Sequence, residues 1–238
     1  MDSKGANTPE TSDSLETTFP HEDEIHEWHE NRKLCLILYH IKRGHLLQQF
    51  LKSQVTDLWL PMPKRVVQRI LEEQDRKPFL DAQKEYLGDG MPSHLNGQHL
   101  SLMDSDSMGL EEVGPLGSGG YGEVHHVIHP QTGRGYARKV MKRPMGFNNH
   151  CEFMKRFKKE LSGMRRVEHH HFVKLTVACT DTEKVMLLSL PVADMDLATF
   201  LDLDLDNNQR NILHNAVGCI TSALTYLHKL NIRRAFPR

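Results

Sequence analysis

The sequence predicts an α+β fold, in which an antiparallel sheet is preceded and followed by helices. Three observations support this prediction. Residues 123–128 are rich in β-branched side chains and follow a glycine-rich stretch, which indicates a β-hairpin. Residues 149–167 carry large apolar side chains at helical spacing, and residues 25–87 show the same period in shorter runs.

The first 109 residues divide by composition into three regions. Residues 1–24 consist largely of Ser, Thr, Asp and Glu, so we expect a disordered tail. Residues 25–87 are predicted to form a helical N-terminal region that packs on the sheet, interrupted by an extended linker at Trp59–Pro63. Residues 88–109 are rich in Gly, Ser, Asp and Pro and are predicted to be a linker.

Residues 116–124 read Leu-Gly-Ser-Gly-Gly-Tyr-Gly-Glu-Val. Closely spaced glycines allow backbone amides to approach phosphate oxygens without intervening Cβ atoms. In a dinucleotide-binding unit such glycines open a helix, and in a P-loop Lys and Ser or Thr follow at once. Here a β-rich stretch and a turn at His129–Gly133 follow instead, so the glycines are predicted to lie in a hairpin.

Together with the next strand, this loop resembles the nucleotide loop of eukaryotic protein kinases, because Ala137 and Lys139 match the Ala-x-Lys of the third kinase strand. The resemblance implies a kinase-like small lobe, with an antiparallel five-stranded sheet and one packed helix. It implies ATP as the cofactor, with Lys139 on the α- and β-phosphates. The implied nucleotide loop comprises Leu116, Gly117, Ser118, Gly119, Gly120, Tyr121, Gly122, Glu123 and Val124.

The helix predicted over residues 149–167 carries the implied partner of Lys139. Glu160 lies 21 residues after Lys139 and nine before His169, where a stretch resembling the kinase His-Pro-x-Ile-Val-x-Leu segment begins. This spacing favours Glu160 over Glu152 as the partner. Without the resemblance, Glu160 would be read as one more solvated charge among the basic residues of the helix.

The apolar strand predicted at Val185–Ser189 leads into a connector that, by resemblance, receives adenine. Leu190 and Val192 would offer backbone hydrogen-bonding groups, and Asp196 would contact the ribose. Val124 and Ala137 would pack on the adenine ring, although both residues are equally compatible with a purely structural role in the strands.

The last predicted helix, at residues 208–230, resembles the kinase helix that leads into the catalytic loop. After Arg233 a kinase presents His-Arg-Asp, whereas this sequence continues Arg-Ala-Phe-Pro-Arg to residue 238. The resemblance therefore implies a truncated kinase domain at 110–238, with the small lobe at 110–193 and the start of a large lobe at 194–238. The catalytic aspartate and the Mg²⁺ ligands of the family are absent from the sequence, so we expect no phosphoryl transfer by these 238 residues.

Two functions stay open at this point. The first is the ATP-binding portion of a protein serine/threonine kinase, and the second is a non-catalytic, pseudokinase-like interaction protein whose protein partner the sequence does not identify. The Leu-Pro segment near residue 60, followed by Phe79 and Leu80, resembles a loosely defined group of fungal serine/threonine kinase-like proteins.

Composition limits the partners and the location. A formal net charge of −1 and a pI near 7.0 give no reason to expect nucleic acid or an acidic membrane as a partner. Four cysteines without paired spacing favour an intracellular location, with cytoplasm and nucleus not distinguished. The longest apolar run, Leu34–Ile41, is too short to span a membrane. Three successive histidines at 169–171 cannot converge on one ion from a strand, so we predict no metal site.

Overall fold

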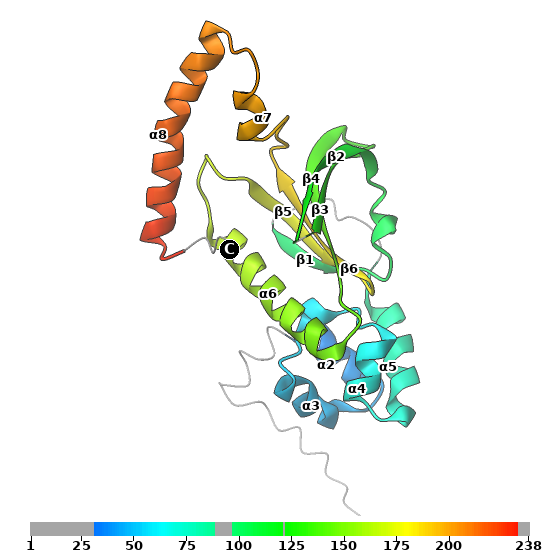
Figure 1. The fold of residues 1–238 in the computed structure, drawn as a ribbon. Coiled ribbons are helices and arrows are strands. Elements are labelled where there is room, and N and C mark those ends of the chain that lie inside the picture. The colour runs from blue at the N-terminus through cyan, green and yellow to red at the C-terminus, as the bar shows by residue number, and fades with distance from the viewer. Residues whose placement is uncertain (1–30, 89–96, 121, 233–238) are drawn as a thin grey trace, which may run out of the picture.

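A computed structural model describes residues 31–88, 97–120 and 122–232 of the chain. A group of short helices, a twisted sheet with one long helix against it, and a final long helix follow one another (Figure 1). The predicted disordered tail at 1–24 and the first residues of the predicted helical region lie outside the described residues.

The sheet has the strand order β1-β5-β6-β4-β3-β2. Strands β2 to β6 pair antiparallel with their neighbours, which agrees with the predicted fold class. The five predicted antiparallel strands are β2 to β6, and a sixth strand that was not predicted, β1, pairs parallel with β5. The strands are β1 (Gln98–Ser101), β2 (Glu111–Gly119), β3 (Gly122–His129), β4 (Arg134–Lys142), β5 (Lys174–Thr180) and β6 (Lys184–Leu190).

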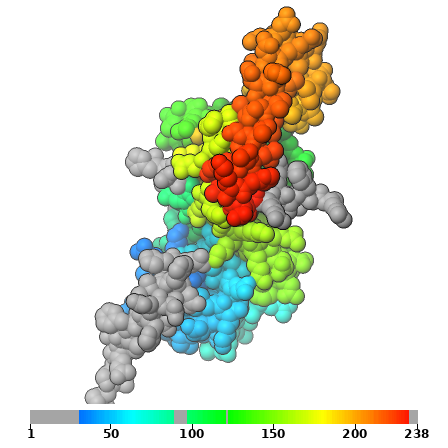
Figure 2. Space-filling view, turned by 90° about the vertical axis from the view of Figure 1, so that its left-hand side faces the viewer, coloured from blue at the N-terminus to red at the C-terminus, as the bar shows by residue number. Residues whose placement is uncertain are grey.

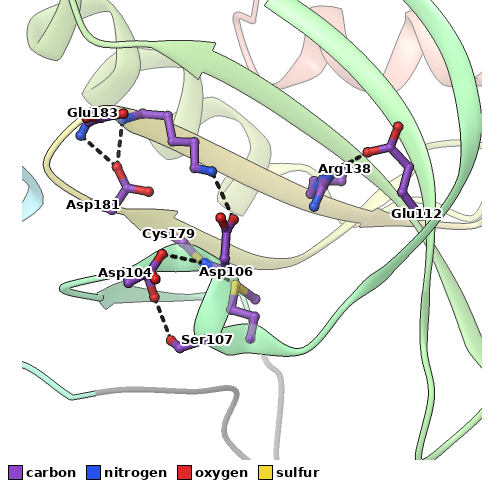
Figure 3. A network of polar contacts seen from close by, with 10 residues as sticks. Asp104, Asp106, Ser107, Glu112, Arg138, Cys179, Asp181 and Glu183 are labelled. Carbon is purple, nitrogen blue, oxygen red and sulfur yellow. Dashed lines mark hydrogen bonds and ion pairs between the residues drawn. The ribbon is translucent and has the colours of Figure 1, made fainter.

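Strand β1 and the short helix η3 (Ser105–Met108) lie where the sequence predicted a linker. The four residues Gln-His-Leu-Ser carry no alternating pattern, and they form a strand because the edge of β5 supplies distant hydrogen-bonding partners. Figure 3 shows the Asp104 carboxylate accepting the amide of Asp106 in η3. The Cys179 thiol of β5 also donates to the Met108 sulfur of η3, at 3.5 Å. This segment therefore belongs to the folded sheet domain.

The helical region packs around the two stacked rings of Phe50 and Phe79, whose centroids lie 5.4 Å apart. The segment predicted as an extended linker, Trp59–Pro63, is largely extended but wholly buried, because its apolar side chains fill the same core. The elements of the region are α2 (Arg32–His40), η1 (Gly44–Leu46), α3 (Leu47–Lys52), η2 (Asp57–Trp59), α4 (Lys64–Ile70) and α5 (Glu73–Tyr86).

Helix α6 (Phe147–Arg166) joins the helical region to the sheet. Its buried side chains Met154, Phe157 and Leu161 recur at helical spacing and belong to one hydrophobic cluster with residues of α2 to α5 and of β4, β5 and β6. In Figure 1 the beginning of α6 lies against the helical region, and the rest of the helix runs along the sheet. One continuous core thus spans both parts of the chain.

After β6 the chain forms α7 (Leu197–Leu201) and α8 (Asn207–Lys229). Asp206 and Gln209 form a reciprocal capping box at the start of α8, which satisfies otherwise unpaired amides. The apolar stripe predicted on this helix is mostly open: Val217 is 63% exposed and Leu227 only 9%. Figure 2 shows α8 lying across one face of the molecule.

Candidate functional site

The glycine-rich segment lies in the hairpin of β2 and β3, as the sequence predicted. Gly119 pairs with Gly122, and Gly117 pairs with Val124. The residues of β2 from Pro115 to Gly119 are exposed, so the backbone of this edge is open to a ligand. Tyr121, at the tip, lies outside the described residues.

Gly122 is required by both its conformation and its surroundings. Its φ of +118° is rarely adopted by other residues, and a Cβ atom there would lie 2.1 Å from the carbonyl oxygen of Val140. The glycine therefore allows the hairpin to fold closely over β4.

We expect Gly122→Ala to destabilise the chain by about 2 kcal/mol or more, because strain at φ and the clash with β4 add together. Gly133→Ala is a matched control, since Gly133 also has a positive φ, +64°, but faces open space. This control is expected to cost about 1 kcal/mol. Urea unfolding of both variants measures the difference, and equal losses would contradict the role assigned to the close contact.

The strand register places the predicted nucleotide-contacting side chains on one face of the sheet. Val124 lies opposite Lys139, and Ala137 lies opposite Ser189. Because paired residues share a face and alternate residues along a strand share it too, all four side chains lie on the same side. Val124 and Ala137 are half-buried, so this face offers apolar surface beside the Lys139 ammonium group.

The expected ion pair of Lys139 and Glu160 is present. Lys139 Nζ donates to Glu160 Oε1 at 2.7 Å, with the two side chains 27% and 37% exposed. Strand β4 presents the lysine and α6 presents the glutamate, so the pair joins the helix to the sheet. An ammonium group held beneath a glycine-rich hairpin is suited to bind a phosphate group.

The connector after β6 holds the remaining predicted residues. Leu190 is the last residue of β6, and Val192 lies two residues later. Both residues are half-buried. Asp196 caps α7, because its Oδ1 accepts the amide of Thr199 at 2.7 Å, and this hydrogen bond lowers the pKa of the Asp196 carboxyl. The capping role went unrecognised in the sequence, although Asp followed three residues later by Thr at a helix start could have indicated it. The predicted ribose contact stays a prediction.

A polar cluster on the opposite face of the sheet was also missed. The carboxylate of Glu112 contacts both His125 Nδ1, at 2.8 Å, and Arg138 Nη2, at 2.7 Å. Arg138 is adjacent to Lys139, so its side chain points to the other side of the sheet. Figure 3 shows its contact with Glu112 there. Strand alternation alone could have separated the two basic residues.

Residues 110–234, slightly more than half of the chain, match the family model of the protein kinase domain. The chain belongs to the protein kinase family. It is similar to the mouse protein serine/threonine-protein kinase 33, with 28% identity over 165 residues, which are 66% of this chain and 31% of that protein. The chain thus spans about a third of this relative's length.

Among solved structures, the chain is similar to the twitchin kinase region from C. elegans. The identity is 27% and the TM-score 0.27, and the match covers 32% of this chain and 12% of that one.

Two further observations concern the described part of the chain. No helix within residues 31–88, 97–120 and 122–232 combines the length and the apolar character needed to cross a bilayer. Within the same ranges, no three His, Cys, Asp or Glu side chains gather closely enough to hold a metal ion.

Proposed function

We propose that the chain binds ATP as the nucleotide-binding portion of a protein serine/threonine kinase. The observation that carries this proposal is the Lys139–Glu160 ion pair, with 2.7 Å between Nζ and Oε1, on the sheet face below the glycine hairpin. In protein kinases the lysine of this pair contacts the nucleotide phosphates. The family match and the serine/threonine kinase relative agree with this proposal.

The other predicted residues give the proposed site an apolar end. Val124 and Ala137 flank Lys139 on one face, so an adenine ring could pack there while the phosphates reach the ammonium group. Leu190 and Val192 would supply backbone groups to the ring, and Asp196 would meet the ribose. Mg²⁺ would accompany ATP in the complete kinase, where its ligands come from segments outside this sequence.

Replacing Lys139 tests the proposal. We expect Lys139→Met to weaken ATP binding by the 238-residue chain about 10- to 100-fold, because a charge-assisted contact of about 1.5–3 kcal/mol is lost. Adenosine affinity should change little, since the ammonium group meets only phosphates. Isothermal titration with ATP and with adenosine measures both.

Arg138→Met is the matched control, because Arg138 is the adjacent cation and lies on the opposite face beside Glu112. It should leave ATP affinity within about twofold, because the Arg138 charge lies on the other face of the sheet and is paired with Glu112. Equal losses in both variants, or no binding of ATP by the unchanged chain, would contradict the proposed site.

A non-catalytic interaction role is the second candidate. It is favoured by the apolar side chains exposed along α8, among them Ile212 at 56% and Ile220 at 49%. A phosphotransfer assay separates the two candidates for any longer form of the protein. Transfer that Lys139→Met abolishes supports the kinase, whereas ATP binding without any transfer supports the interaction role.

A further inference from the structure

Arg143, the residue directly after β4, lies at the junction of three parts of the fold. Its side chain is 4% exposed. Nε donates to His150 Nε2 in α6 at 3.0 Å, and Nη2 donates to the carbonyl oxygen of Trp59 at 2.8 Å. Nη1 donates to the carbonyl oxygens of Pro61, at 2.8 Å, and of Asp181 in the turn between β5 and β6.

The acceptors around the Arg143 guanidinium group lie in the directions in which its N–H groups point. Burial lowers the pKa of Arg143 to about 9, and the carbonyl dipoles and the His150 ring replace the water it has lost. The planar fork of an arginine presents five donors in fixed directions, whereas a lysine ammonium offers three donors from one nitrogen atom. Because Arg143 only donates, His150 accepts at Nε2 and carries its proton on Nδ1.

Two contacts join β4 and its continuation to α6. Arg143 contacts His150 near the start of the helix, and Lys139 contacts Glu160 ten residues later. Ten helical residues span about 15 Å, so the two contacts are well separated along the axis. The apolar side chains of α6 hold the helix in the shared core, and the two polar contacts fix its direction relative to the strand at two separate points.

The helical region anchors the first of these contacts. The acceptors from Trp59 and Pro61 belong to the buried extended segment, and Arg65 Nη2 donates back to the carbonyl oxygen of Arg143 at 3.3 Å. The Trp59 ring also packs against the His150 ring, with the centroids 4.9 Å apart. The segment therefore holds both members of the Arg143–His150 contact.

We propose that Arg143 is a positioning residue: anchored by the carbonyl groups of residues 59–61, it sets the direction of α6 and thereby keeps Glu160 against Lys139. Its effect on ATP binding rests on the function proposed above. Its effect on α6 does not, and can be measured without nucleotide.

The test compares His150→Phe with His150→Gln in the 238-residue chain. Phenylalanine keeps a ring against Trp59 but removes the acceptor for Arg143, whereas glutamine keeps an acceptor near the position of Nε2. Amide hydrogen exchange followed by mass spectrometry reports on peptides from α6 and from β3 to β6 separately. Titration with ATP gives the apparent Kd of each variant.

We expect His150→Phe to speed exchange in α6 about tenfold while the strands stay protected, because the helix opens locally. The apparent Kd for ATP should rise as well, because it is inversely proportional to the fraction of the chain in the competent arrangement. His150→Gln should resemble the unchanged chain in both measurements. Arg76→Met is the control within the helical region, since Arg76 donates to the carbonyl oxygens of Leu71 and Gln68 within that region.

Unchanged exchange in α6, or equal acceleration in helix and strands, would overturn the proposal in favour of a merely structural role. Faster exchange in α6 without any ATP binding by the unchanged chain would support the positioning role and reject the proposed function. Arg143→Met removes every contact of the side chain and should give a larger effect of the same kind. If Arg143→Met does not fold, the comparison of His150→Phe with His150→Gln still tests the proposal.

Discussion

Replacing Phe79 by alanine is expected to destabilise the folded chain by about 3–5 kcal/mol, the usual cost of a large cavity in a packed core. Phe79 is fully buried, and its ring stacks on that of Phe50. Leu36→Ala is the control, because Leu36 is 55% exposed, and it should change stability by less than about 0.5 kcal/mol. Urea unfolding followed by far-ultraviolet circular dichroism measures both.

The same measurement tests whether the core is continuous. Phe79 belongs to one cluster with Phe157 of α6 and Leu187 of β6, so helices and sheet should unfold in a single transition. We expect Phe79→Ala to shift that transition as a whole. A variant in which tryptophan fluorescence reports an early transition, while the exchange protection of the strands persists, would show that the two parts fold independently.

Acid is expected to destabilise the folded chain before most carboxylates are protonated. Burial, with Arg143 close by, lowers the pKa of His150 to about 3 from its ordinary value of 6.5. Below pH 6.5 the unfolded chain therefore binds a proton that the folded chain does not. Stability is full above pH 6.5 and falls by about 1.4 kcal/mol per pH unit toward pH 3, or about 2 kcal/mol at pH 5.

His99 should add to this effect, because burial also lowers its pKa to about 3. Its Nε2 contacts Thr180 Oγ1 at 3.0 Å, which ties β1 to β5. Urea unfolding at pH 7.5 and at pH 5 measures the loss. His150→Gln, which cannot titrate, should lose less stability between the two values than the unchanged chain, and an equal loss in both would contradict the part assigned to His150.

The features predicted well from the sequence are those that depend on neighbouring residues or on fixed spacings. The glycine hairpin follows from Gly117 to Gly122 and the β-branched residues after them. The ion pair was predicted from the resemblance to protein kinases, and the spacings from Lys139 to Glu160 and from Glu160 to His169 favoured Glu160 over Glu152. Both are properties of short stretches of chain.

The features that were missed depend on partners far away in the sequence. Strand β1 exists because β5 offers an edge about 80 residues later, as in the pairing of Leu100 with Cys179. Arg143 looks like any other cation in a basic stretch, and only the folded chain brings the carbonyl groups of Trp59 and Pro61 to it. No local sequence pattern indicates which backbone carbonyl groups will accept from a distant arginine, since every residue has a carbonyl group.

The shared core makes the cooperative folding unit longer than the stretch that carries the family motifs. A polypeptide begun at Leu110 would keep the glycine hairpin, Lys139 and Glu160, but its α6 would present Met154 and Phe157 to water in place of the helical region. It would also lose β1, leaving the edge of β5 without its partner strand. A fragment with boundaries chosen from the kinase motifs alone should therefore aggregate more readily than one that also includes the helical region from Asn31.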